Sequence, residues 1–217
     1  MTKLLTCMTL REEVEQVVTK NPGIEVDYLE YALHQVPGRL RSQLRARIDA
    51  TPGAGDILLG YGLCSYGTAG LGSTRHRLVI PRVHDCISLL MGDQQRYLKE
   101  FSRYPGTFYL SKGWIDQGAD PLSTYRRYQK DYGEETASWL MEQQYRNYQR
   151  VVFILSGVPG LDEYLGYARE VAGFLKVPFL VQEGSLRLLE KLVQGPWDRE
   201  FIVTEPGEII LQQAFFG

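Results

Sequence analysis

The residues of this sequence best suited to chemistry are its three cysteines, Cys7, Cys64 and Cys86. A cysteine thiolate can bind a metal ion or act as a nucleophile. An odd number of cysteines makes a disulfide framework a poor explanation for them. Taken as a count alone, three free cysteines are most simply small buried hydrophobic residues. Their positions along the chain favour a different interpretation.

Each cysteine follows a different predicted strand. Cys7 ends an apolar run at the start of the chain, Cys64 follows the run Asp56–Gly62, and Cys86 follows Leu78–Pro81. The carboxyl ends of parallel strands lie along one edge of a sheet, where α/β proteins bind their ligands. We therefore expect the three sulfur atoms to converge to within roughly 7 Å of one another, as a shared metal or cluster requires.

Three thiol ligands from three separate loops suit a metal site with one open position. The spacing lacks the closely paired cysteines of zinc fingers and ferredoxins. An open fourth position is typical of catalytic zinc, and three thiolates on a four-iron cluster leave one iron free to bind a substrate. The sequence therefore predicts Cys7, Cys64 and Cys86 as metal ligands, and leaves open whether the cofactor is a 4Fe–4S iron–sulfur cluster or zinc.

Two further candidates come shortly before Cys86. His84 could be a fourth ligand or a proton donor, since imidazole is the commonest nitrogen ligand, or it could be a capping or second-layer residue. Arg82 would offset the thiolate charge, and a helix beginning at Cys86 would lower the pKa of that thiol. Asp85 is most simply the N-cap of this helix. His84 and Arg82 are the predicted catalytic residues.

Glycines beside Cys64 and a serine near the C-terminus are candidates for holding a cofactor. Gly60, Gly62 and Gly67 allow the backbone to approach a ligand closely, although a tightly turned loop explains them as well. Ser185 begins a predicted helix whose N-terminus could bind an anion, or it simply caps that helix. No dinucleotide or P-loop fingerprint accompanies these residues. His76, between two arginines, is expected to be solvated.

The composition is that of an ordinary globular protein. The chain has 217 residues, of which 44% are apolar, and a formal net charge of −2. These values argue against disorder and against a basic surface for nucleic acid. No apolar run approaches the roughly 18 residues of a membrane span, and the N-terminus lacks the features of a signal peptide. We therefore expect a cytoplasmic protein that binds a small molecule and neither nucleic acid nor membrane.

Short β-branched runs alternate with helical patterns along the chain. This alternation predicts an α/β fold with a mostly parallel sheet and helices on both faces, Rossmann-like and possibly in two lobes. The predicted strands are 3–8, 24–31, 56–62, 78–81, 106–111, 150–155, 178–182 and 200–204. The predicted helices are 11–20, 37–50, 86–92, 94–103, 121–148 with a break near Gly133, 161–175 and 185–193. We expect a single α/β domain over 1–217, with a possible second Rossmann-like lobe over 150–217.

Three motifs resemble those of the domain-of-unknown-function 1638 family. They are GYGLC at Gly60–Cys64, PRVHDC at Pro81–Cys86 and PGTFYL at Pro105–Leu110, and the likeness extends from the Cys7 strand to the region of Trp197 and Asp198. The resemblance implies signature positions at Cys7, Cys64, His84, Asp85 and Cys86. It also implies an origin in anaerobic bacteria and archaea, often with corrinoid-dependent methyltransferases encoded nearby. It supplies no reaction.

The residues and the resemblance support one main hypothesis and two alternatives. The main hypothesis is a metal-dependent protein whose open three-cysteine iron–sulfur cluster binds or transforms a small molecule in anaerobic metabolism. In the first alternative, a zinc–thiolate site assists corrinoid-dependent methyl transfer, with a corrinoid or methyltransferase protein as the partner. In the second, the protein is a non-catalytic accessory or carrier of a metal or corrinoid.

Overall fold

The computed structural model describes residues 2–216 and divides into two compact units. Unit 1 comprises Met1–Tyr97 together with Ser185–Gly217, and unit 2 comprises Leu98–Gly184. The chain leaves unit 1 once and later returns to it, so unit 2 is an insertion. The expected lobe over 150–217 therefore spans parts of both units, because the boundary falls at Ser185, between its second strand and its second helix.

Unit 1 is built on a five-stranded sheet. Its strands lie in the order β2-β1-β3-β4-β8, and all neighbours are parallel except β4 and β8. The strands are β1 (Thr2–Cys7), β2 (Ile24–Leu29), β3 (Gly55–Gly60), β4 (His76–Pro81) and β8 (Phe201–Thr204). The predicted mostly parallel α/β sheet is thus confirmed, with one antiparallel strand at its edge.

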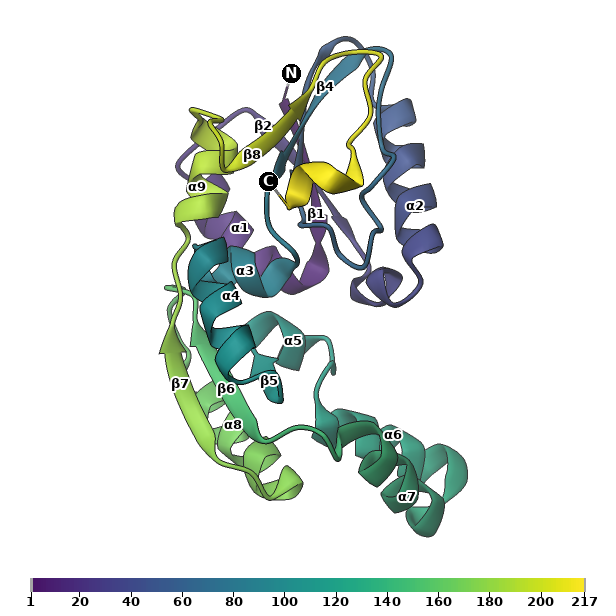
Figure 1. Ribbon diagram of the computed structural model, residues 1–217, viewed down its shortest axis with the longest axis vertical. Helices are drawn as coiled ribbons and strands as arrows, with labels where there is room; N and C mark the ends of the chain where they lie inside the picture. Colours follow the sequence, from purple (N-terminus) through teal and green to yellow (C-terminus); the bar gives the residue numbers. More distant parts are fainter. Residues whose placement is uncertain (1, 217) are drawn as a thin grey trace. The chain divides into compact units, whose positions relative to one another are not determined.

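Helices cover both faces of this sheet (Figure 1). On one face lie α2 (Pro37–Ala50) and the C-terminal 3-10 helix η3 (Gln212–Phe215), and on the other lie α1 (Arg11–Val18) and α9 (Arg187–Gln194). The shorter helices of unit 1 are η1 (Met8–Leu10), η2 (Tyr31–Gln35) and α3 (Cys86–Met91). The first residues of α4 (Gln94–Arg103) also belong to unit 1.

The alternation of side chains along the strands explains why both faces are covered. Leu5 and Ile57 share a buried cluster with Leu44 of α2. Leu4 and Leu58, the chain neighbours of Leu5 and Ile57, are as deeply buried. Since successive residues of a strand point to opposite faces, Leu4 and Leu58 lie on the α1 and α9 side. Both faces therefore need helices to exclude water from the apolar centres of these strands.

Unit 2 has its own sheet of three parallel strands. The strands lie in the order β5 (Thr107–Leu110), β6 (Arg150–Leu155) and β7 (Phe179–Glu183). Its helices are α5 (Lys112–Asp116), α6 (Pro121–Tyr132), α7 (Glu134–Tyr145) and α8 (Asp162–Leu175). Ala168 and Val171 of α8 pack in one buried cluster with Val151 and Phe153 of β6. The predicted break at Gly133 separates α6 from α7.

The side chain of His76 is buried, although the residue stands between two arginines in the sequence. The expectation that His76 is solvated is wrong, since its side chain is buried and its Nε2 atom lies 3.1 Å from the carbonyl oxygen of Thr51. The histidine begins β4, where strand pairing turns it inward between its two arginine neighbours. Within residues 2–216, the structure contains no helix long and apolar enough to cross a membrane.

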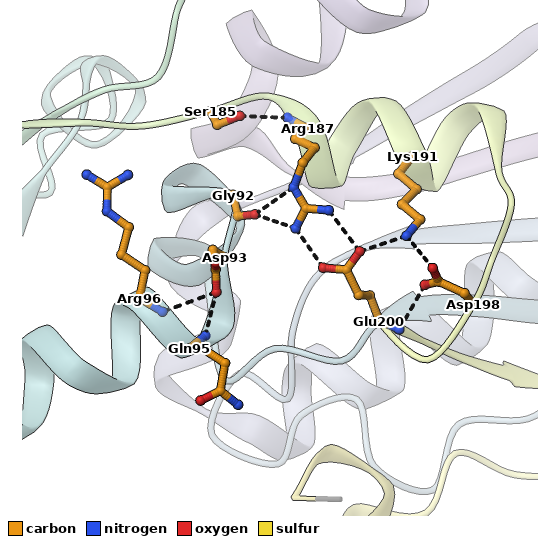
Figure 2. Close-up of polar contacts among 9 residues, drawn as sticks. All are labelled: Gly92, Asp93, Gln95, Arg96, Ser185, Arg187, Lys191, Asp198 and Glu200. Carbon is orange, nitrogen blue, oxygen red and sulfur yellow. Dashed lines mark hydrogen bonds and ion pairs between the residues drawn. The ribbon is translucent and has the colours of Figure 1, made fainter.

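A network of ion pairs fixes α9 within unit 1 (Figure 2). The Arg187 guanidinium donates to both carboxylate oxygens of Glu200, at 2.8 and 2.6 Å, and to the carbonyl oxygen of Gly92 at 2.7 Å. The ammonium group of Lys191 lies 2.6 Å from Asp198 and 2.7 Å from Glu200. Hydrogen bonds from Arg187, and then from Lys191, lower the pKa of Glu200 to about 2. The network joins α9 to the end of α3 and to the segment before β8.

We expect Glu200→Gln to reduce stability in a pH-dependent way. Folding lowers the Glu200 pKa from 4.5 to about 2, so its contribution is complete above pH 4.5 and is lost as the pH falls toward 2. The variant should lose about 1 kcal/mol of unfolding free energy at neutral pH and less of it in acid. Urea unfolding across this pH range measures the difference. Glu30→Gln, which removes an exposed carboxylate of the same unit, is the control, and an unchanged pH profile for Glu200→Gln would contradict the assignment.

Candidate functional site

The three cysteines lie at the carboxyl ends of three neighbouring parallel strands of unit 1. Cys7 is the last residue of β1, Cys64 follows β3, and Cys86 begins α3 after β4. The chain runs from β1 outward to β2 and then back to β3 on the other side of β1, so the strand order reverses between β1 and β3. Such a switch point is where open α/β sheets form their binding crevice. The predicted common edge is therefore observed.

Backbone pairing holds the loop of Cys64 beside the loop of Cys86. The amide of Leu63 donates to the carbonyl oxygen of Val83 at 2.9 Å, and the amide of Cys64 donates to that of His84 at 2.9 Å. Gly62 makes this approach possible, because a Cβ atom there would lie 2.6 Å from the Val83 carbonyl oxygen. Gly62 therefore allows a close approach, as predicted, but the partner is the backbone of the loop before Cys86.

The other two glycines predicted near the cofactor also face protein atoms. A Cβ atom at Gly60 would collide with the side chain of Thr6, and one at Gly67 would lie 2.7 Å from Leu40 of α2. Thr68 donates its hydroxyl to the carbonyl oxygen of Gly62 at 2.9 Å. Small residues therefore let this loop pack tightly on β1 and α2, which fixes the path of the chain through Cys64.

Three consecutive residues with side chains adopt left-handed backbone conformations in this loop. The φ angles of Cys64, Ser65 and Tyr66 are 45°, 54° and 67°. Each such residue costs roughly 1–2 kcal/mol. The turn is held by a hydrogen bond from the amide of Gly67 to the carbonyl oxygen of Cys64 at 2.9 Å, and by Arg41, which donates to that of Tyr66 at 2.7 Å. Strain of this kind is concentrated at functional sites.

The three thiols are protonated at neutral pH because their surroundings disfavour a negative charge. Burial raises the pKa of Cys7, although a hydrogen bond donated by the Thr9 hydroxyl at 3.2 Å works in the other direction. Burial and then the charge of Asp85 raise the pKa of Cys64 to about 12. Burial, Cys64 and Asp85 raise that of Cys86 well above its ordinary value. The expected lowering of the Cys86 pKa is therefore wrong, since the helix N-terminus is outweighed.

The thiols share one neighbourhood. The charge of Cys7 raises the pKa of Cys64, and the charges of Cys64 and Cys7 raise that of Cys86. All three thiols also act on Tyr61, whose pKa is raised mainly by burial and then by Cys7, Cys64 and Cys86. Tyr61 packs in the same buried cluster as Cys7 and Cys64. Sequence reasoning missed it, although it stands inside the GYGLC motif between two of the glycines considered above.

The predicted N-cap of α3 is confirmed. The Oδ1 atom of Asp85 accepts hydrogen bonds from the amides of Ile87 at 3.0 Å and Ser88 at 3.2 Å, and its Oδ2 atom accepts one from the Tyr97 hydroxyl at 3.1 Å. Burial raises the pKa of Asp85, and the nearby His84 is among the groups that oppose this rise. The His84 ring meets the ring of Phe216 edge-on, with their centroids 5.5 Å apart. His84 therefore lies in the loop before Cys86 with its ring against Phe216.

The structure gives Arg82 contacts with backbone carbonyl groups of the C-terminal part of the chain. Its guanidinium donates to the carbonyl oxygens of Ala214 at 2.7 Å and Phe201 at 3.4 Å, and so anchors η3 and β8. These contacts make Arg82 a support for the C-terminal segment.

The structure also places Ser185 apart from the cysteines. Its hydroxyl accepts a hydrogen bond from the Arg187 amide at 3.2 Å (Figure 2). Its amide donates to the carbonyl oxygen of Leu90 at 2.8 Å. It lies at the Gly92 end of α3, opposite the end that carries Cys86. The N-cap interpretation of Ser185 agrees with this contact.

The donors at the sheet edge do not form a complete metal site by themselves. Among residues 2–216, no group of three or more histidine, cysteine, aspartate and glutamate side chains is arranged to hold a metal ion. Within this part of the chain, the structure therefore places the three cysteines at one edge of the sheet and shows no ready-made metal site. Chemically, the arrangement offers three neutral thiols, a buried phenol and a buried carboxyl group.

We expect the thiols of the folded, metal-free protein to react slowly with iodoacetamide. Because the thiolate is the reactive form and its pKa is raised at all three positions, the labelling rate should still be rising at pH 9. Mass spectrometry of the labelled peptides gives a rate for each cysteine. The same protein unfolded in urea is the control and should label faster. A plateau well below the ordinary thiol pKa of 9.0 would contradict this expectation.

We also expect Gly62→Ala to destabilise unit 1. The new Cβ atom would meet two fixed backbone atoms, the Val83 carbonyl oxygen at 2.6 Å and the Asp85 amide nitrogen at 2.7 Å. Separating the loops should cost about 1–3 kcal/mol, as overpacking does elsewhere. Gly38→Ala is the matched control, because a Cβ atom there has nothing within 4 Å. Thermal unfolding compares the two variants, and equal midpoints would contradict the importance of the close approach.

Comparison with known proteins agrees with the motifs. The family model described as Protein of unknown function (DUF1638) matches residues 28–193, which include Cys64, His84 and Cys86 and leave Cys7 outside the matched segment. A search of curated proteins and a search of solved structures gave no match. The matched segment covers more than half of the sequence and contains both paired loops. The chain therefore belongs to the DUF1638 family.

Proposed function

We propose that unit 1 binds an iron–sulfur cluster through Cys7, Cys64 and Cys86, and that a small molecule of anaerobic metabolism binds or reacts at the open position of the cluster. The observation that supports this proposal is the placement of all three cysteines at the carboxyl ends of three neighbouring parallel strands, at the switch point of one sheet. Three core cysteines with no common role would have no reason to follow three adjacent strands.

The type of ligand, cysteine thiols, is the one that such a group uses. Iron–sulfur clusters and zinc are both bound by thiolates, which three separate loops supply here. Bare thiolates repel one another and Asp85, and this repulsion contributes to the raised pKa values. The positive charge of a metal would offset it, so binding would release protons and strengthen with rising pH. When bound, the cluster supplies an iron atom with a free coordination position.

The chain's own residues have separate tasks in this proposal. The paired loops place Cys64 and Cys86, and the Thr9 hydroxyl stabilises the thiolate of Cys7. His84, two residues before Cys86, is the group available to bind as a fourth ligand or to donate a proton. No group of side chains among residues 2–216 is arranged to hold a metal, so ligation would require the loops to rearrange. The strained turn that begins at Cys64 is the part of the site that would move in this proposal.

Anaerobic metal analysis tests the proposal. Protein made and purified without oxygen should be brown, with visible charge-transfer absorption and with iron and acid-labile sulfide in similar amounts. Cys7→Ser, Cys64→Ser and Cys86→Ser should each lose most of the iron, because three thiolates are needed. Ser65→Ala, in the same loop, is the control and should retain it. Circular dichroism establishes that every variant is folded.

The possible outcomes separate the candidate metals. A colourless protein with one zinc ion bound through the cysteines would contradict the iron–sulfur proposal and favour a zinc–thiolate site that assists corrinoid-dependent methyl transfer. A cluster with no small-molecule binding would favour a carrier of the metal. Equal metal content in wild type and in a variant with all three cysteines changed to alanine would contradict every thiol-ligated form of the proposal.

A further inference from the structure

The outer edge of β7 in unit 2 exposes apolar side chains. β7 stands at the end of the order β5-β6-β7, so among residues 2–216 no strand pairs with its other edge (Figure 1). Leu180 and Val181 are 41% and 43% exposed, whereas the strand at the opposite edge, β5, is mostly buried. Proteins usually protect an exposed edge with lysine, proline or a bulge, because another strand can pair with it. The sequence of β7, FLVQE, contains neither lysine nor proline.

The bonds between β7 and β6 determine which backbone groups of β7 point outward. Before β7, the carbonyl oxygen of Pro178 accepts a hydrogen bond from β6 at 2.9 Å, and after β7 the amide of Gly184 donates one to β6 at 2.8 Å. Even-numbered positions therefore face β6, since alternate residues of a strand bond to the same neighbour. The residues whose N–H and C=O groups face outward are Phe179, Val181 and Glu183.

Opposite charges stand at the two ends of this edge, on one face of the sheet. The guanidinium of Arg169, on α8, lies over the ring of Phe179, 4.9 Å from its centroid. Phe179 therefore points toward α8, and so does Glu183, because every second side chain of a strand lies on the same face. Arg169 and Glu183 are both exposed. The edge thus has a cation beside its first residue and an anion at its last residue.

We propose that β7 pairs with β7 of a second copy of this chain, antiparallel about a two-fold axis at Val181. In this register Val181 faces its own symmetry mate, and Phe179 lies opposite Glu183 of the second copy. The outward N–H and C=O groups of both strands then meet one another. Arg169, beside Phe179, comes next to Glu183 of the second copy, and the symmetry repeats this ion pair at the other end.

The same-chain partner is favoured because the edge is complementary to itself. An antiparallel copy brings the anionic end of one edge to the cationic end of the other, while a parallel copy would bring like charges together. The result is one continuous sheet made from the two three-stranded sheets. One strand from each copy is a small interface, so we expect a dimer with a Kd on the order of micromolar. This inference concerns unit 2 and does not rest on the cysteines.

Sedimentation velocity of the full chain across the micromolar range, with a reductant present, tests the proposal. Wild type should pass from monomer to dimer as its concentration rises. Arg169→Glu and Glu183→Arg should each raise the dimer Kd about tenfold or more, because each places like charges together. The double variant with both changes should return the Kd to nearly the wild-type value. Glu142→Arg, an exposed change on α7 with the same charge difference as Glu183→Arg, is the control and should leave it unchanged.

A second variant tests the backbone pairing itself. Val181→Pro removes an N–H group that points away from β6, and such a position of an edge strand accepts proline. It should abolish the dimer and keep the circular dichroism of the wild type, whereas Val181→Thr, which retains the N–H group, should still dimerise. Wild type that stays monomeric would overturn the proposal. A dimer that Val181→Pro leaves intact, or single charge reversals that the double variant fails to rescue, would overturn it as well.

Discussion

The backbone pairing between the loop after β3 and the loop after β4 is the constraint on which the candidate site depends. Two amide hydrogen bonds, from Leu63 and Cys64, join the loops. The contact needs glycine at position 62, because any Cβ atom would enter the opposite backbone. The position of Cys7 at the same edge is set by the register in which β1 pairs with β3. Backbone geometry therefore places the three cysteines at one edge of the sheet.

Burying three cysteines near one another makes the ionised form of each thiol energetically unfavourable. Burial and mutual repulsion raise their pKa values, and Asp85 adds a further acidic group because the helix of Cys86 needs an N-cap. The left-handed turn beginning at Cys64 and the unpartnered hydroxyl of Tyr61 lie in the same short stretch. Natural sequences mostly agree with their fold at every level, and they depart from this agreement at functional sites. The concentration of conflicts in one loop distinguishes this place from an ordinary core.

Periodicity and strand rules were sufficient to predict most of the fold. The helix Pro37–Ala50 and the strand Arg150–Leu155 occur with the predicted bounds, and the common edge of the cysteines follows from parallel strands alone. Features that depend on distant contacts were not predictable. Arg82 resembles a free cation in the sequence, yet it binds carbonyl groups of residues more than a hundred positions later. The return of the chain to unit 1 at Ser185 leaves no local signal either, since strand and helix simply continue to alternate.

The division into units places all the candidate site residues in one of them. The cysteines, Tyr61, His84 and Asp85 all belong to unit 1, whose five-stranded sheet contains none of the strands of unit 2. The chain leaves unit 1 after Tyr97, and the hydroxyl of this residue is bonded to Asp85, the N-cap of the helix that begins at Cys86. The chain re-enters at Ser185, next to the Arg187 and Glu200 network (Figure 2). The two points at which the chain passes between the units therefore lie, on the unit 1 side, beside the N-cap of the Cys86 helix and beside the network that holds α9.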